Sequence, residues 1–115
     1  EEQPQETQTR ETPPPMQPSV KEFLIEADDM GFYMNGADIS SISAGSGQAL
    51  KITFNVRTQN VYYGGLDFRS SYFDTVIIKP GEQKTVEFTA DKTFTFTSYW
   101  PATGVKKADG EVIVQ

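Results

Sequence analysis

Apolar and polar residues alternate along three segments of the chain, and this alternation limits the available folds more than any other feature. The segments are residues 51–57 (KITFNVR), 84–90 (KTVEFTA) and 93–100 (TFTFTSYW). Successive side chains of a β-strand point to opposite faces, so this period of two predicts strands with one buried face. The residues expected to face the interior are Ile52, Phe54, Val56, Val86, Phe88, Ala90, Phe94 and Phe96.

Other short apolar runs predict further strands, and turn residues separate them. Additional strands are expected near residues 21–27, 39–43, 61–68 and 75–79 and at the C-terminal EVIVQ. Glycine-containing pairs such as Asn-Gly, Gly-Gly, Pro-Gly and Asp-Gly lie between the runs and are typical of turns. No segment shows a sustained helical period. Short strands at this spacing favour an all-β sandwich or barrel.

Residues 1–19 differ in composition from the rest and predict a linker. They read EEQPQETQTRETPPPMQPS, with Met16 as the only sizeable apolar side chain. Such a segment buries too little apolar surface to offset the entropy of ordering it. The run Pro13–Pro15 favours an extended polyproline II spacer. We therefore expect a disordered or extended Pro/Glu/Gln-rich linker at 1–19 and one folded domain at 20–115.

The charge of the chain argues against a nucleic-acid partner. Ten basic residues stand against 16 acidic ones, for a net charge of −6. Nucleic-acid binding requires a basic surface, and no basic stripe is present. No apolar run reaches transmembrane length. A polar spacer followed by a β domain, in a chain that does not start with Met, is typical of a mature exported protein, so we expect an extracytoplasmic (periplasmic or cell-surface) location. A membrane tether N-terminal to residue 1 fits this expectation.

The chain contains neither histidine nor cysteine. The usual zinc and copper ligands are therefore missing, as are the Ser-His and Cys-His pairs of nucleophilic catalysis. Disulfides are excluded as well. We expect no cofactor, no metal centre and no enzymatic activity, although acid catalysis by Asp or Glu is not formally excluded.

Several strings resemble the cupredoxins, the superfamily of the blue-copper proteins and oxidase subunit II. GFYMNGADISSISAGSGQALKITF is similar to the opening of that family, and LDFRSSYFDTVIIKPGEQKTVEFTADKTFTFTS to the stretch between its first and second ligand strands. GEVIVQ resembles its closing strand. The likeness covers about residues 22–115. It implies a cupredoxin-like Greek-key sandwich of about seven to eight strands.

The resemblance also implies where copper ligands would stand, and each position holds a residue that does not replace its ligand. The family uses a His, then a Cys, a second His and often a Met. The matching positions are Leu66, Ser98, Val105 and Ala108. Leucine has no lone pair, and a neutral serine hydroxyl is a poor copper ligand. The resemblance therefore implies a domain that has lost type 1 and dinuclear copper.

Aromatic residues are the candidate partner-binding group. The resemblance implies that several of them lie at the end of the sandwich where copper proteins dock their partners. Large, stiff, partly polar rings dominate interface hot spots and carbohydrate platforms. The alternative is that they fill the space of the missing metal site. The residues are Tyr62, Tyr63, Tyr72, Phe73, Tyr99, Trp100 and Pro101.

Three smaller features have structural explanations as well as functional ones. Met30 and Met34, with Met16 as a third ligand, would suit Cu(I), but methionines also fill gaps in a core. Asp28 and Asp29 near Glu26 are interpreted as a solvated edge that opposes aggregation. The adjacent pair Lys106 and Lys107 is interpreted as an ordinary solvated turn, with steering of an acidic partner as the alternative.

The resulting hypothesis is a non-catalytic, copper-free interaction or structural domain. It would serve as an accessory subunit of an extracytoplasmic or membrane-attached assembly, which the resemblance suggests is a redox complex, and would bind a protein partner at the former copper end. The alternatives are a copper-handling protein that uses methionines and a carbohydrate or adhesion module that uses the aromatic end. The oligomeric state is not predicted.

Overall fold

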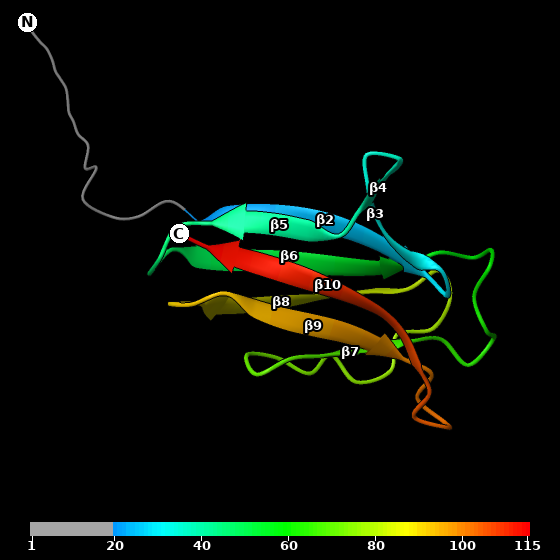
Figure 1. Cartoon of the computed structure of the whole chain (residues 1–115). Helices are drawn as coiled ribbons and strands as arrows, with labels where there is room; N and C mark the ends of the chain where they lie inside the picture. The colour runs from blue at the N-terminus through cyan, green and yellow to red at the C-terminus, as the bar shows by residue number, and fades with distance from the viewer. Residues whose placement is uncertain (1–19) are drawn as a thin grey trace, which may run out of the picture.

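The computed structural model describes residues 20–115, which form two stacked β-sheets without a helix (Figure 1). The expectation of a linker at 1–19 lies outside these described residues. Nine strands are present in the described part, against the seven to eight expected. They are β2 (Lys21–Asp28), β3 (Gly31–Met34), β4 (Ala37–Ile39), β5 (Ser41–Ala44), β6 (Ala49–Val56), β7 (Asp67–Arg69), β8 (Gln83–Thr89), β9 (Phe94–Tyr99) and β10 (Lys106–Val114).

The strands divide into a five-stranded and a four-stranded sheet. The first has the order β4-β3-β2-β6-β8 and the second β5-β10-β9-β7. β2 pairs with β6 in parallel, and β10 pairs with β5 in parallel, while the remaining neighbours are antiparallel. The all-β sandwich predicted from alternation is therefore confirmed. Within the described residues, no helix is both long and apolar enough to cross a membrane.

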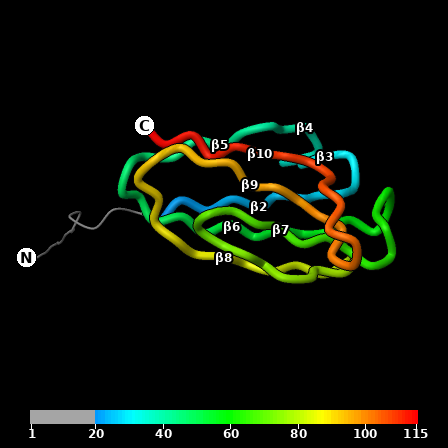
Figure 2. The backbone as a smooth tube through the Cα atoms, turned by 60° about the horizontal axis from the view of Figure 1, so that its bottom comes forward, coloured from blue at the N-terminus to red at the C-terminus, as the bar shows by residue number. Residues whose placement is uncertain are grey.

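The strand directions give the sandwich two distinct ends. β2 begins and β10 finishes at one end, which we call the terminal end (Figure 2). At the opposite end β2, β6 and β9 finish and β10 begins. This opposite end carries the turn at 29–30, the segment 57–65 and the loop 100–105, and we call it the aromatic end.

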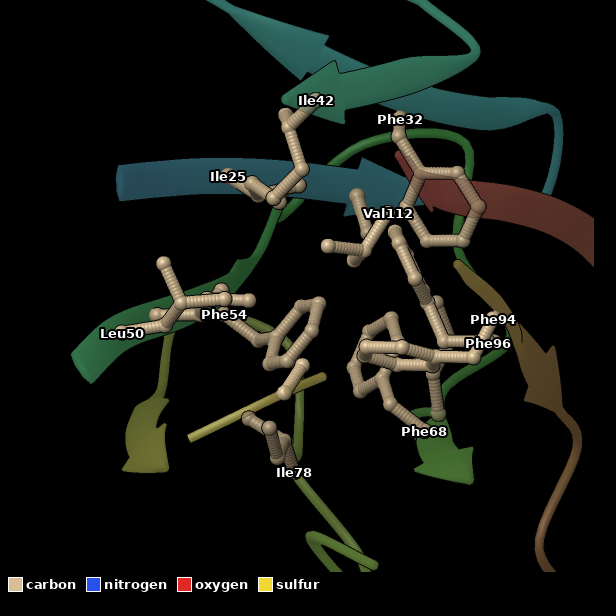
Figure 3. Close-up of a cluster of buried hydrophobic side chains, with 14 of the residues drawn as sticks. Ile25, Phe32, Ile42, Leu50, Phe54, Phe68, Ile78, Phe94, Phe96 and Val112 are labelled. Carbon is tan, nitrogen blue, oxygen red and sulfur yellow. The ribbon is translucent and has the colours of Figure 1, made fainter. Parts of the chain in front are cut away.

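The core lies between the two sheets and is rich in phenylalanine (Figure 3). Phe54 of β6 stacks on Phe68 of β7 with ring centroids 4.5 Å apart. Phe96 of β9 meets both Phe32 and Phe54 edge-on, at 5.0 and 5.7 Å. The alternating residues of β6 and β9 are buried as predicted, whereas Val86 and Phe88 are only half-buried because β8 is an edge strand.

The single strand predicted near residues 39–43 is wrong. The chain crosses between the sheets at Ser40, so β4 ends at Ile39 in one sheet and β5 begins at Ser41 in the other. The carbonyl of Ser40 accepts a hydrogen bond from the N–H of Glu111. β3 and β4 form a hairpin whose two turn residues, Asn35 and Gly36, have φ of 53° and 83°. Positive φ at both positions is typical of the Asn-Gly type I′ turn.

The strands predicted at 61–68 and 75–79 are also mostly wrong. Only residues 67–69 form a strand there, and residues 61–65 form a loop. Leu66 pairs with Ile78, while the N–H of Thr75 donates to the carbonyl of Phe68. The two residue steps from Leu66 to Phe68 therefore lie opposite the three steps from Thr75 to Ile78, which is the geometry of a β-bulge. Val76 sits in the bulge at φ 54°, a strained value for a β-branched residue.

Candidate functional site

The aromatic end is held together by Asp29, which follows β2. Its N–H donates to the carbonyl of Asn60 at 2.9 Å. One carboxylate oxygen accepts the indole N–H of Trp100 at 3.0 Å, and the other accepts the backbone N–H of Tyr62 at 3.1 Å. A single side chain thus links three segments that are far apart in the sequence. The turn at 29–30, the segment 57–65 and the loop 100–105 form one connected surface.

The aromatic rings of this end are stacked against each other. Tyr62 lies 5.1 Å from Trp100 and 4.4 Å from Tyr63, measured between ring centroids. The ammonium of Lys107 lies 4.0 Å from the centre of the Trp100 ring, in a cation–π contact. Hydrogen bonding to the Tyr63 side chain, and then desolvation, raise the pKa of Tyr62 above its ordinary value. These contacts leave Trp100 half-buried.

Two side chains project from this surface. Tyr63 is 81% exposed and Met30 is 78% exposed. Met30 directly follows Asp29 in the chain. Tyr63 directly follows Tyr62, whose backbone N–H donates to the Asp29 carboxylate. Met30 and Tyr63 therefore project from the same corner of the aromatic end. Val105, 43% exposed, belongs to the neighbouring loop, and its carbonyl accepts the N–H of Trp100 at 2.9 Å. Apolar groups therefore protrude from a backing that hydrogen bonds hold in place.

The structure separates two of the predicted partner-binding residues from the others. Tyr72 and Phe73 follow β7 and pack against Phe88 and Phe94, with ring centroids 4.5 to 6.2 Å apart. The Tyr72 hydroxyl donates to Asp91, in the turn between β8 and β9 at the terminal end. Both residues are half-buried, and they extend the core rather than the aromatic end.

The remaining residues of the predicted group lie at or beside the aromatic end. Pro101 is half-buried in the loop that follows Trp100. Tyr99 ends β9, and the guanidinium of Arg69 lies 4.6 Å from its ring. That guanidinium is held by two hydrogen bonds to Asp67, which raise the pKa of Arg69 and keep it charged.

The interpretation of Asp28 and Asp29 as a solvated edge is wrong. Asp28 is 1% exposed, and one of its oxygens accepts the N–H groups of Met30 and Gly31 and the hydroxyl of Tyr33. The carboxylate substitutes for missing strand partners in the tight turn. The adjacent pair of acids gives no sequence signal for these structural roles. The Trp100 that donates a hydrogen bond to Asp29, for example, lies 71 residues away in the chain.

The adjacent lysines are not an ordinary solvated turn either. Lys106 forms an ion pair with Asp109 at 2.8 Å, and Lys107 contacts Trp100. The Lys106 ammonium first, and the Thr97 hydroxyl second, lower the pKa of Asp109 through hydrogen bonds. Both lysines thus stabilise the start of β10.

The four positions that match copper ligands do not fit a copper ion. Leu66 and Ser98 are both fully buried on the inner face, near the aromatic end. The Ser98 hydroxyl donates to the carbonyl of Ala108 in a long bond of 3.4 Å. Ala108 packs against the core, and Val105 faces solvent. These side chains together offer one neutral hydroxyl, so they lack the donor set of a cupredoxin centre.

The methionines are split between two environments. Met34 packs against the core, as the structural interpretation expects, whereas Met30 is exposed. The third suggested ligand, Met16, lies outside the described residues. Among residues 20–115, no three acidic side chains come together in a way that would hold a metal ion.

Comparisons with known proteins place this geometry among copper proteins. A scan against family models finds no match, and a search of curated proteins finds none either. The copper nitrite reductase of Nitrosomonas europaea is similar over 84% of this chain and 42% of the reductase, with 19% identity and a TM-score of 0.60. A multicopper oxidase of Pseudomonas thermotolerans is similar over 86% of this chain and 30% of the oxidase, with 13% identity and a TM-score of 0.63.

A third similar structure is closer to this chain in size. It is a copper-binding protein solved in solution in its apo form, with 17% identity and a TM-score of 0.56 over 87% of this chain and 92% of that one. The chain spans less than half the length of the reductase and of the oxidase. Identities this low show the fold alone. The described part of the chain therefore has the cupredoxin-like fold.

Proposed function

We propose that this chain is a non-catalytic, copper-free interaction domain that binds a protein partner through its aromatic end. The assembly that it serves is an extracytoplasmic or membrane-attached one, in which the domain is an accessory subunit. The observation that carries the proposal is the pair of highly exposed residues, Tyr63 and Met30, on a backing fixed by Asp29.

The rigidity of the backing supports this role. Binding costs free energy whenever loops and side chains must be ordered, and a surface that is already ordered avoids much of that cost. Asp29 bonds both Tyr62 and Trp100, so the rings are in place before a partner arrives. Tyrosine and methionine are enriched in the buried cores of protein interfaces. The aromatic end thus combines an apolar anchor with a preformed support.

The placement of the start of β2 also supports this role. β2 begins at Lys21, at the terminal end, so a tether through the preceding residues would attach opposite the aromatic end (Figure 1). The aromatic end would then face away from the tether. The similar structures include a reductase and oxidases, which makes a redox assembly the natural context by analogy of fold.

Site-specific photo-crosslinking tests the proposal. A benzophenone amino acid replaces Tyr63 in one sample and Lys92 in the control, which is an exposed residue of the turn between β8 and β9 at the terminal end. Both are irradiated with a membrane and periplasmic extract of the source organism. We expect a discrete protein adduct from position 63 only. Equal labelling from both positions, or none from position 63, would contradict the proposal.

Affinity measurements with the purified protein that was crosslinked then give the contribution of Tyr63 to binding. Tyr63→Ala should weaken affinity about 30-fold, which corresponds to about 2 kcal/mol and is the threshold of a hot spot. Lys92→Ala should leave affinity unchanged. A titration with Cu(I) and Cu(II), followed by absorption spectroscopy and calorimetry, tests the copper-free part. Tight stoichiometric binding that is lost in Met30→Ala would support the methionine-based copper function instead.

A further inference from the structure

A polar hollow lies beside the end of β6, separate from the aromatic rings. Its volume is about 380 Å³, and residues 55–59, Glu26 and Gly81 line it. Small-molecule sites occupy about 300–1,000 Å³. Its lining offers two side-chain amides, a threonine hydroxyl, a guanidinium and a carboxylate. A ligand would therefore meet several hydrogen-bond donors and acceptors there, beside apolar side-chain surface.

Arg57 is fixed in this hollow by three contacts. Its Nε donates to Glu26 Oε1 at 3.1 Å, and its guanidinium lies 3.7 Å from the ring centre of Tyr33. Nη1 stands 3.7 Å from a carboxylate oxygen of Asp28. The side chains of Arg57 and Glu26 nevertheless remain 31% and 42% exposed. A donor and an acceptor are thus held side by side, with exposed surface that a ligand can reach.

The charges of the hollow select a neutral ligand. Glu26 and Arg57 compensate each other's charge, so the pair offers neither an anion nor a cation an uncompensated partner. The carboxylate of the buried Asp28, 3.7 Å from Arg57 Nη1, weakens the attraction of the guanidinium for an anion further. A hydroxyl group both donates and accepts, so neighbouring hydroxyls suit an adjacent guanidinium and carboxylate. Asn55 and Gln59 provide the same combination in their amides.

We propose that this hollow binds a neutral polyhydroxylated ligand, namely one sugar residue of a glycan. The inference does not depend on the proposed protein partner, because it uses neither Met30 nor any of the aromatic residues on which that proposal rests. The site is open and small, so the dissociation constant for one sugar unit should be on the order of a few millimolar. The exposed aromatic rings are not required for this binding.

The test is an NMR titration of the isotope-labelled full chain. The neutral probes are N-acetylglucosamine and the methyl glycosides of glucose, galactose and mannose. The charged probes are glucuronic acid and glucosamine. N-acetylglycinamide serves as an amide probe. We expect saturable shifts at the amide groups of Asn55 and Gln59 and at Arg57 Nε–H, with at least one neutral sugar binding several-fold more tightly than the charged probes and the amide.

Matched variants show whether these residues form the site. Glu26→Gln should weaken the best neutral sugar at least fivefold, because it removes the carboxylate beside Arg57. Gln59→Ala should weaken it as well, and this exposed position keeps the test valid if Glu26→Gln is unstable. Glu22→Gln, also on β2, should have no effect.

Three results would overturn the proposal. The first is the absence of shifts at these residues with all neutral sugars up to about 100 mM, well above the expected constant. The second is tighter binding of a charged probe or of the amide. The third is a set of shifts confined to Tyr63 and Trp100, which would place sugar binding on the aromatic end instead.

Discussion

Replacing Asp29 by asparagine should loosen the whole aromatic end. The carboxylate accepts the Trp100 indole N–H at 3.0 Å and the Tyr62 N–H at 3.1 Å. Asparagine keeps one acceptor oxygen, so one of these donors would face an NH₂ group. A hydrogen bond to a charged group contributes about 1.5–3 kcal/mol. With an m-value of about 2 kcal/mol/M, the urea midpoint should fall by about 0.8–1.5 M.

The fluorescence of Trp100 measures this effect directly, because the chain contains one tryptophan. We expect Asp29→Asn to shift native emission to the red and to lower the unfolding midpoint seen by fluorescence and by circular dichroism. Asp38→Asn removes the same charge from an exposed position of β4 and should change neither observable. An Asp29→Asn protein with native emission and a native midpoint would refute the role given to this carboxylate.

Five further substitutions are predicted, each measured by urea unfolding of the variant against the native chain. Gly65→Ala should cost about 3 kcal/mol or more, because a Cβ at φ +83° would stand 2.3 Å from a backbone oxygen of the facing segment. Gly104→Ala, at φ +73° with no atom within 4 Å, should cost only about 1–2 kcal/mol, and equal costs for the two variants would contradict this contact. Val76→Asn should raise stability by about 0.5–1 kcal/mol, because asparagine tolerates the left-handed conformation and the valine side chain is exposed. A loss of stability in this variant would show that the bulge is not strained. Ser98→Ala should change stability by less than about 1 kcal/mol, since the buried hydroxyl makes only a 3.4 Å bond, and a loss of 2–3 kcal/mol would reveal a stronger partner. The folded-state pKa of Asp109 is lowered, so the stabilising effect of this carboxylate is present above its unfolded pKa near 3.8 and is lost as pH falls through the folded value. The loss of stability caused by Asp109→Asn should therefore shrink in acid. A loss of stability that stays constant from pH 7 to pH 2 would contradict this linkage.

The strands that could be predicted are those with one buried face and regular pairing. β6 lies between two neighbours, and its alternating residues Ile52 and Phe54 have no exposed surface. β9 behaves in the same way. In β8 the alternation located the strand correctly but overestimated the burial of Val86, because alternation does not reveal that a strand lies at the edge of its sheet.

The features that could not be predicted depend on contacts between distant segments. The crossing at Ser40 interrupts a run of β-forming residues without a Gly or Pro signal. The bulge at Val76 sits in a sequence, TVIIK, that has high strand propensity throughout. Propensity describes how well a residue suits a pleated surface, and it does not specify where the partner strand changes register.

The same reasoning explains why the aromatic residues predicted to bind a partner do not all lie at one end of the sandwich. The family resemblance suggested that several aromatic residues gather at one end of the sandwich. Tyr72 instead reaches Asp91 near the terminal end, because β7 is antiparallel to β9 and leads the chain away from the aromatic end. Trp100 lies at the predicted end, but its partner Asp29 was assigned to a solvated edge.

The aromatic end shows how this fold connects its loop to its strands without a metal ion. The ligand positions implied by the resemblance join the interior strands to the loop before β10, and the residues there do not coordinate copper. In their place, the Asp29–Trp100 hydrogen bond connects the loop to β2, and Lys107 covers the same ring. Leu66, elsewhere at this end, is held by paired backbone hydrogen bonds to Ile78, at 2.8 and 3.0 Å. Introducing copper ligands at the four positions would therefore leave these connections intact, and the loop would have to rearrange against them before it could bind metal. The polar and aromatic contacts that order the aromatic end are thus the same ones that oppose the loop rearrangement that a copper site would require.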